Sequence, residues 1–212
     1  MTKSSRTRQL DATDLARVAV VAAIVAVLGL PGGFSLFGGV PITAQTLGVM
    51  LAGALLGPWL GALSMAVLLA LVATGLPLLA GGRGGIGVFV GPSAGYLFGW
   101  IAGALVIGLI VHAGGRKPVA WRTFAGVVTG GILLVYAIGI PVQSLVTRLP
   151  LAETALTSLV FVPGDLAKAV IATAVVTTLV RAYPRAFRRT WAAAKPAVAS
   201  APAPDRDGAP VA

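Results

Sequence analysis

Residues 43–74 read TAQTLGVMLAGALLGPWLGALSMAVLLALVAT and contain no charged side chain. Two apolar segments, Thr43–Leu56 and Trp59–Thr74, are separated only by Gly57 and Pro58. Because glycine accepts unusual dihedral angles and proline cannot continue an existing helix, this pair predicts a tight reversal between two helices. The stretch therefore predicts a helical hairpin.

The same apolar character extends over most of the 212-residue chain. Of all residues, 57% are hydrophobic and 10% are charged, against roughly 25% charged in an ordinary soluble domain. We expect an all-α integral membrane protein whose residues 15–182 form six transmembrane helices. A basic N-terminus (residues 1–14) precedes them, and a basic, then Ala/Pro-rich tail (residues 183–212) that we expect to be disordered follows. The six apolar segments are Leu15–Leu30, Thr43–Leu56, Trp59–Thr74, Pro92–His112, Arg122–Ile140 and Pro163–Val180.

The basic residues sort between alternate connections of these segments. Two of them, Arg83 and Arg148, fall in the connections on one side. Cytoplasmic loops carry the excess of Lys and Arg, so both termini should be cytoplasmic and the protein should lie in the cytoplasmic membrane. The net charge of +10 is then explained by the Lys and Arg residues that gather on the cytoplasmic side of the membrane. We therefore expect no nucleic-acid partner. The basic residues assigned to the cytoplasmic side are Lys3, Arg6, Arg8, Arg17, Arg116, Lys117, Arg122, Arg181, Arg185, Arg188, Arg189, Lys195 and Arg206.

The residue types present exclude several kinds of chemistry. There is no cysteine and a single histidine, His112, so we expect no disulfide, no metal site and no cofactor. No G-x-x-x-x-G-K-[ST] motif occurs, so any ATP dependence must come from partner proteins. Catalysis has little support, and we expect a protein that is not an enzyme.

Small residues recur at helical spacing, in two glycine series that start at Gly53 and at Gly91. Such series let helices approach closely, and packing inside the bundle is the favoured interpretation. The first segment has an alanine face that includes Ala19 and Ala23, which meets either a neighbouring helix or a partner protein.

The predicted outer connections 31–42 and 75–91 are rich in glycine, and we expect them to fold inward over a ligand site. The connection 141–162 contains a stretch that can form a short helix.

Ionisable residues open the last segment, in the sequence PGDLAK of residues 163–168. Charged groups in membrane segments cost roughly 2.5–3.5 kcal/mol each on insertion scales, so their presence needs a reason. Pro163 is favoured in a first helical turn, which places Asp165 near the positive end of the helix dipole. Lys168 lies three residues further on, within reach of Asp165. The pair is interpreted as a ligand contact in the outer half of the membrane, and a mutually satisfied ion pair that only caps the helix is the alternative.

Four further residues are candidates for a binding site. Arg83 stands in a glycine-rich stretch and can clamp a carboxylate by two hydrogen bonds. Thr43 and Gln45, like Thr46 beside them, are polar among apolar neighbours and can line a cavity or cap the helix. Thr43 is the better candidate for a cap, and Gln45 for a contact with a ligand amide or carbonyl. Tyr96, with Trp100 one turn later, can supply an apolar wall.

Four stretches then carry a resemblance to a known family over roughly residues 15–182. They are VPITAQTLGV (40–49), LLGP (55–58), GPSAGY (91–96) and FVPGDLAKA (161–169). In their order and spacing the sequence resembles BioY, the biotin-specific substrate-binding subunit of energy-coupling-factor (ECF) transporters. The resemblance implies a six-helix subunit that captures biotin from outside, with a transmembrane coupling protein and two ATPases as partners in the lipid bilayer.

The resemblance also implies roles for the candidate residues. Asp165 accepts from the ureido N–H groups of biotin, and Lys168 donates to the ureido carbonyl or steadies Asp165. Arg83 is the candidate for the valerate carboxylate, and Gln45 for a secondary polar contact. The alanine face with Ala19 and Ala23 resembles a surface for docking on the coupling protein. Two alternatives stay open: a subunit of the same architecture for another vitamin, such as thiamine or riboflavin, and an integral membrane enzyme that uses Asp165 or Lys168.

Overall fold

The structure is a computed structural model that describes residues 10–32, 40–115 and 117–184. The predictions for the basic N-terminus, for most of the 31–42 connection, for Arg116 and for the tail beyond residue 184 lie outside these residues. The described chain is helical, with an isolated bridge of extended backbone between Leu79 and Arg83. Its helices are α1 (Ala12–Val27), α2 (Gln45–Ala73), α3 (Ala94–Val111), α4 (Ala120–Val128), α5 (Val135–Thr147), α6 (Leu151–Ser158) and α7 (Val162–Ala182). Short helical turns lie at η1 (Ile86–Phe89), η2 (Ala113–Gly115), η3 (Thr129–Leu134, a π-helix) and η4 (Leu159–Phe161).

Four helical stretches of the described chain are long and apolar enough to cross a membrane. They are Gln45–Ala73, Ala94–Gly115, Ala120–Thr147 and Leu151–Ala182. α1 has 16 residues, somewhat fewer than the roughly 20 that a crossing needs. The fold is therefore all-helical, as predicted, and its apolar helices are those of a membrane protein.

The helix named α2 contains the predicted reversal. Gly57 has a φ of 81°, outside the helical region. A methyl group placed on Gly61 would lie 2.8 Å from the carbonyl oxygen of Ala52. In a continuous helix these two residues would be about 13 Å apart along the axis, so the chain folds back on itself. The hairpin predicted from Gly57 and Pro58 is confirmed.

The single histidine supports this reversal. Pro58 has no N–H, so the carbonyl of Ala54, four residues earlier, loses its helical partner. Nε2 of His112, at the end of α3, lies 2.9 Å from that carbonyl oxygen. His112 is 2% exposed, and its Nε2–H tautomer donates the missing hydrogen bond. Gly108, one turn earlier on α3, lies against the backbone of Gly57 and Pro58, with no room for a side chain.

The glycines of α2 and α3 face other helices, as predicted. Gly53 lies against Ala104 and Ile107 of α3, while Gly95 lies against α5 at Ile138 and Val142. Packing inside the bundle is thus confirmed for them. Gly91 precedes α3, which begins at Ala94, and does not join this face.

Two boundaries differ from the prediction. The fifth segment was expected to end at Ile140, but α5 continues through Pro141 to Thr147. A proline inside a membrane helix is tolerated because neighbouring groups and local adjustments satisfy the freed backbone. The first segment is α1, which begins at Ala12 and so includes part of the expected N-terminal region. The short helix expected within 141–162 is α6.

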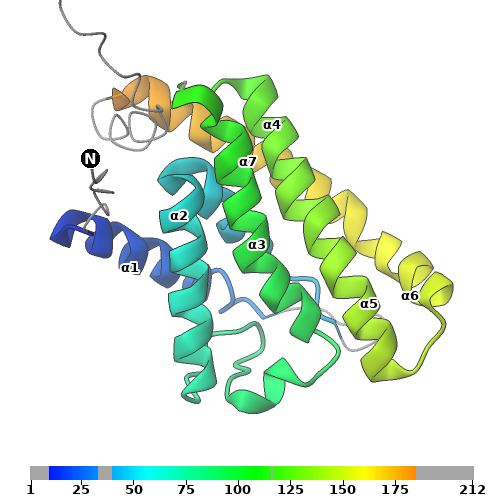
Figure 1. Cartoon of the computed structure of the whole chain (residues 1–212). Coiled ribbons are helices and arrows are strands. Elements are labelled where there is room, and N and C mark those ends of the chain that lie inside the picture. The colour runs from blue at the N-terminus through cyan, green and yellow to red at the C-terminus, as the bar shows by residue number, and fades with distance from the viewer. Residues whose placement is uncertain (1–9, 33–39, 116, 185–212) are drawn as a thin grey trace, which may run out of the picture.

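The connections divide between two ends of the bundle (Figure 1). The α3–α4 connection and the end of α7 lie at one end. The loop between α2 and α3 lies at the other, together with the connection from α5 to α6. The start of α7 therefore faces the second end, and it brings the ionisable residues to a cavity there.

Candidate functional site

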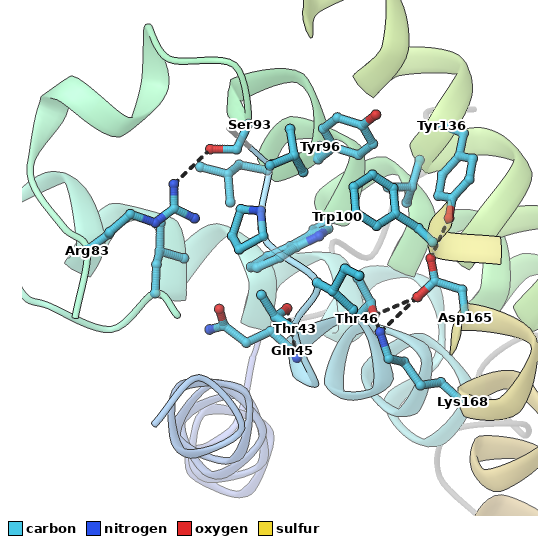
Figure 2. Close-up of a pocket in the computed structure, with 17 residues that line it drawn as sticks. Thr43, Gln45, Thr46, Arg83, Ser93, Tyr96, Trp100, Tyr136, Asp165 and Lys168 are labelled. Carbon is cyan, nitrogen blue, oxygen red and sulfur yellow. Dashed lines mark hydrogen bonds and ion pairs between the residues drawn. The ribbon is translucent and has the colours of Figure 1, made fainter. Parts of the chain in front are cut away.

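A cavity lies among the start of α2, the start of α3, α5 and the start of α7 (Figure 2). About 580 Å³ of space, part of it open to solvent, is not filled by protein atoms there. All six residues predicted to bind a ligand line it. Its lining consists of Val40, Pro41, Ile42, Thr43, Gln45, Thr46, Leu79, Arg83, Ser93, Tyr96, Leu97, Trp100, Val135, Tyr136, Phe161, Asp165 and Lys168.

Asp165 and Lys168 form an ion pair at the start of α7. Helix α7 begins at Val162 with Pro163 in its first turn, and this places Asp165 near the helix N-terminus. Nζ of Lys168 lies 2.9 Å from Oδ1 of Asp165. Their side chains are 16% and 7% exposed, respectively. The predicted pair is therefore present, and it faces the cavity instead of open solvent.

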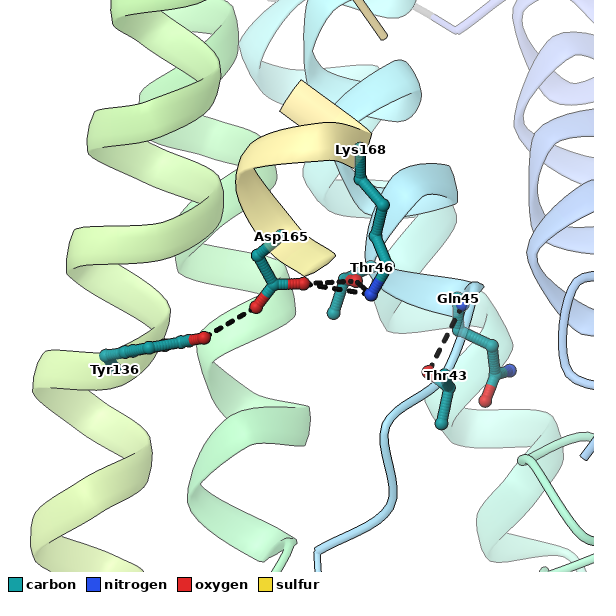
Figure 3. A network of polar contacts seen from close by, with 6 residues as sticks. All are labelled: Thr43, Gln45, Thr46, Tyr136, Asp165 and Lys168. Carbon is teal, nitrogen blue, oxygen red and sulfur yellow. Dashed lines mark hydrogen bonds and ion pairs between the residues drawn. The ribbon is translucent and has the colours of Figure 1, made fainter. Parts of the chain in front are cut away.

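Two further hydroxyl groups complete this cluster (Figure 3). Thr46 of α2 donates to Oδ1 of Asp165 at 3.2 Å and accepts from Nζ of Lys168 at 2.9 Å. Tyr136 of α5 donates to Oδ2 of Asp165 at 2.6 Å. We call Asp165, Lys168, Thr46 and Tyr136 the polar cluster. It joins three helices around one carboxylate.

Sequence reasoning missed Tyr136. It named Thr46 as a residue that can line a cavity, which it does, but gave it no partner in the polar cluster. The available signal for Tyr136 was a hydroxyl within a strongly apolar segment, since a buried tyrosine O–H usually has a hydrogen-bond partner. That signal names no partner. Asp165 lies 29 residues further along the chain, on another helix.

Arg83 lies at the opposite end of the cavity from the polar cluster (Figure 2). Its Nε donates to the carbonyl of Ala80 at 3.2 Å, and its Nη1 donates to Oγ of Ser93 at 3.3 Å. Partial burial lowers the pKa of the Arg83 guanidinium below its ordinary value, yet arginine stays protonated at neutral pH. Neither ion pair found in the described chain involves Arg83, so its charge is available to an anion.

Gln45 lines the cavity, but its amide group bonds to the backbone. Its Nε2 donates to the carbonyls of Val25 and Leu78, at 3.2 and 3.0 Å. Its Oε1 accepts from the N–H of Ala80 at 2.9 Å. Gln45 thus ties α1 and the 75–91 loop to α2, and Figure 3 shows its side chain pointing away from the polar cluster. A ligand contact by Gln45 stays a prediction, with one acceptor position left for it.

Thr43 and Tyr96 have structural partners as well. Oγ1 of Thr43 accepts from the backbone N–H of Gln45 at 3.2 Å, which is the capping role expected for Thr43. The hydroxyl of Tyr96 donates to Oε1 of Gln143 at 2.8 Å and lies 3.2 Å from Oγ of Ser158. The ring of Tyr96 is left as part of the apolar cavity wall, together with Trp100.

The predicted docking residues lie on α1, away from the cavity. Ala19 and Ala23 are exposed, whereas Ala22 between them is buried against the bundle. The alanine face is therefore split: part of it packs on the bundle, and Ala19 and Ala23 remain open. Docking on a partner stays a prediction for these two residues.

Apolar helices around a buried ion pair and a cavity are those of a multi-pass membrane protein. The family model described as "BioY family" matches residues 1–185. A protein named Biotin transporter BioY from Rhodobacter capsulatus is 47% identical over 179 residues, which cover 80% of this chain and 94% of that protein. A protein named Probable biotin transporter BioY from Bacillus subtilis is 47% identical over 163 residues, covering 76% and 87% of the two chains. The chain belongs to the BioY family.

A solved structure has the same fold. The crystal structure of the S-component for biotin from an ECF-type ABC transporter matches with a TM-score of 0.76 and 33% identity. The match covers 85% of this chain and 95% of that one. The resemblance noted in the sequence is thus confirmed, and the alternative of an integral membrane enzyme is set aside.

Proposed function

We propose that this protein captures biotin from the outer side of the cytoplasmic membrane, as the substrate-binding subunit of an ECF transporter. The observation that carries the proposal is the separation of charge in the cavity, with the polar cluster at one end and Arg83 at the other (Figure 2). Family relatives named as biotin transporters support the same ligand.

The chemistry of biotin matches this arrangement. Its ureido ring offers two N–H donors and one carbonyl acceptor, and its valerate chain ends in a carboxylate. The ureido ring meets Asp165 and Lys168, which supply an acceptor and a donor side by side. The apolar ring and chain lie along Tyr96 and Trp100, and the carboxylate reaches the guanidinium of Arg83.

The proposal places six crossings in the membrane. They are α1, the two arms of α2, α3, the continuous α4–η3–α5 helix, and α7, with both termini in the cytoplasm. The charges of the described residues support this orientation. Lys117 belongs to the α3–α4 connection and Arg181 to the last turn of α7, whereas Arg83 belongs to the α2–α3 loop and Arg148 to the α5–α6 connection. Figure 1 shows the first two elements at one end of the bundle and the other two at the opposite end. The glycine-rich 75–91 loop, which supplies Leu79 and Arg83 to the lining, then covers the cavity on the outer side.

Release of biotin inside the cell requires partners. The chain has no P-loop motif, so a coupling membrane protein and two ATPases supply the energy. Ala19 and Ala23, open on α1, form the surface for the coupling protein, because small residues let a partner helix approach closely.

The proposal is tested by calorimetric titration of the detergent-purified protein. Biotin should bind at one molecule per chain and be recovered chemically unchanged, whereas thiamine and riboflavin should give no heat of binding. Binding of another vitamin without binding of biotin would assign the cavity to that vitamin and refute the proposal.

A further inference from the structure

The polar cluster has few hydrogen-bonding positions left. A carboxylate offers about four acceptor positions, two on each oxygen. In the described chain, Oδ1 of Asp165 already accepts from Lys168 and Thr46, and Oδ2 accepts from Tyr136. One acceptor position on Oδ2 is left for a ligand.

The donor side shows a similar shortage. The ammonium group of Lys168 has three N–H donors. Two of them go to Asp165 and to Oγ1 of Thr46. The cluster therefore presents one open acceptor next to one open donor. That pair complements a ligand with one N–H and one C=O in adjacent positions, as along one edge of a cyclic urea.

We infer that Tyr136 is a positioning and specificity residue, which fixes Oδ2 of Asp165 so that it accepts from one N–H of the ligand. The inference rests on the proposed function and deepens it. The 2.6 Å bond from Tyr136 occupies one side of Oδ2 and holds the carboxylate plane, so the open position points in a single direction.

Two features of the fold hold Tyr136 in place. The π-helix at Thr129–Leu134 ends two residues before it. A π-turn inserts one extra residue, which rotates everything after it by about 100° relative to a continuous α-helix. Further, the ring of Tyr136 meets the ring of Tyr96 edge to face, with centroids 6.2 Å apart and planes at 78°. Tyr96 is in turn fixed by Gln143 and Ser158.

The test compares three ligands in two proteins. The ligands are biotin and the biotin analogues methylated at one or the other ureido nitrogen, and the proteins are the wild type and Tyr136→Phe. Phenylalanine keeps the ring and removes the hydroxyl. We expect Tyr136→Phe to bind biotin about tenfold more weakly, while its affinity for the analogue that lacks the accepted N–H stays unchanged. The ratio of the affinity for biotin to the affinity for that analogue should therefore be about tenfold lower in Tyr136→Phe than in the wild type.

A purely structural role for Tyr136 would weaken both ligands equally and leave this ratio unchanged, and that result would overturn the inference. Ser144→Ala is the matched control, because it removes a hydroxyl of the same helix that donates to the carbonyl of Leu149 and does not line the cavity. Its ratio should equal that of the wild type. A wild type that binds no biotin would instead refute the proposed function itself.

The wild type alone provides a second test, which does not depend on the folding of Tyr136→Phe. With one acceptor position open, methylation at one ureido nitrogen should cost much more affinity than methylation at the other. Equal losses for the two analogues would contradict the single open position and overturn the inference.

Discussion

Replacing Asp165 by asparagine changes one atom of the polar cluster and tests its role most directly. The amide oxygen can take the place of Oδ1 and accept from Lys168 and Thr46. The NH₂ group then takes the place of Oδ2, where the hydroxyl of Tyr136 can turn to accept from it. The open acceptor position becomes an N–H donor. It then faces the ureido N–H of the ligand, and two donors cannot form a hydrogen bond.

The size of the effect follows from these contacts. A hydrogen bond to a charged group contributes about 1.5–3 kcal/mol, and each 1.4 kcal/mol is a factor of ten in affinity. The loss of that bond to the ligand predicts a rise in Kd of about 10- to 150-fold. Lys168 also loses its counter-ion, which lowers stability because its side chain is 16% exposed and cannot be fully rehydrated.

Calorimetric titration of the purified protein with biotin measures this rise. Glu153→Gln is the matched control, since it neutralises an exposed acid on α6 outside the cavity, and its Kd should equal that of the wild type. Thermal unfolding without ligand separates a loss of binding from a loss of fold. A Kd for Asp165→Asn within about twofold of the wild type would refute the role of this carboxylate and leave it as a helix cap.

Three further outcomes are expected. Arg83→Gln should weaken biotin by about tenfold and leave biotin methyl ester unchanged in the same titration, because the ester carries no charge for the guanidinium; equal effects on the two ligands would contradict a carboxylate contact. Gly108→Ala should lower the unfolding free energy by about 1–3 kcal/mol, because a methyl group there meets the backbone of the α2 reversal, while Gly87→Ala has open space and should unfold like the wild type. Ala19→Trp combined with Ala23→Trp should abolish biotin uptake by cells and leave the Kd of the purified protein unchanged, since both residues lie outside the cavity; normal uptake would remove α1 as the docking surface.

Much of the fold could be predicted because its signals are local. A glycine followed by a proline between two apolar segments is enough to predict the reversal at Gly57, and PGDLAK is enough to start α7. The continuation of α5 through Pro141 could not be predicted in this way. Whether a proline ends a membrane helix depends on which neighbouring groups satisfy the freed carbonyl, and those groups come from other parts of the chain.

The same distinction separates the predicted from the missed residues of the site. Asp165 and Lys168 are three residues apart on one helix, so their spacing predicts their contact. Tyr136 reaches Asp165 from another helix, in a direction set by the π-turn before it. For Gln45, the polar character predicts a buried partner but not which one, and its amide meets backbone atoms of α1 and of the 75–91 loop.

Two long helices that contribute to the cavity wall, α2 and α3, also help the site to keep its shape. α2 and α3 meet at one end through His112, Gly108 and the reversal at Gly57, where backbone touches backbone. Their other ends supply Thr46 and Tyr96 to the cavity. These contacts are remote from the ligand, and they fix the two helices in addition to the bonds that Gln45 and Thr46 make at the cavity. α7 differs, because its ionisable residues reach α2 through Thr46 and α5 through Tyr136. A ligand held by the polar cluster and by Arg83 adds a bridge between α7 and the 75–91 loop, so its binding energy stabilises the arrangement of the helices around the cavity.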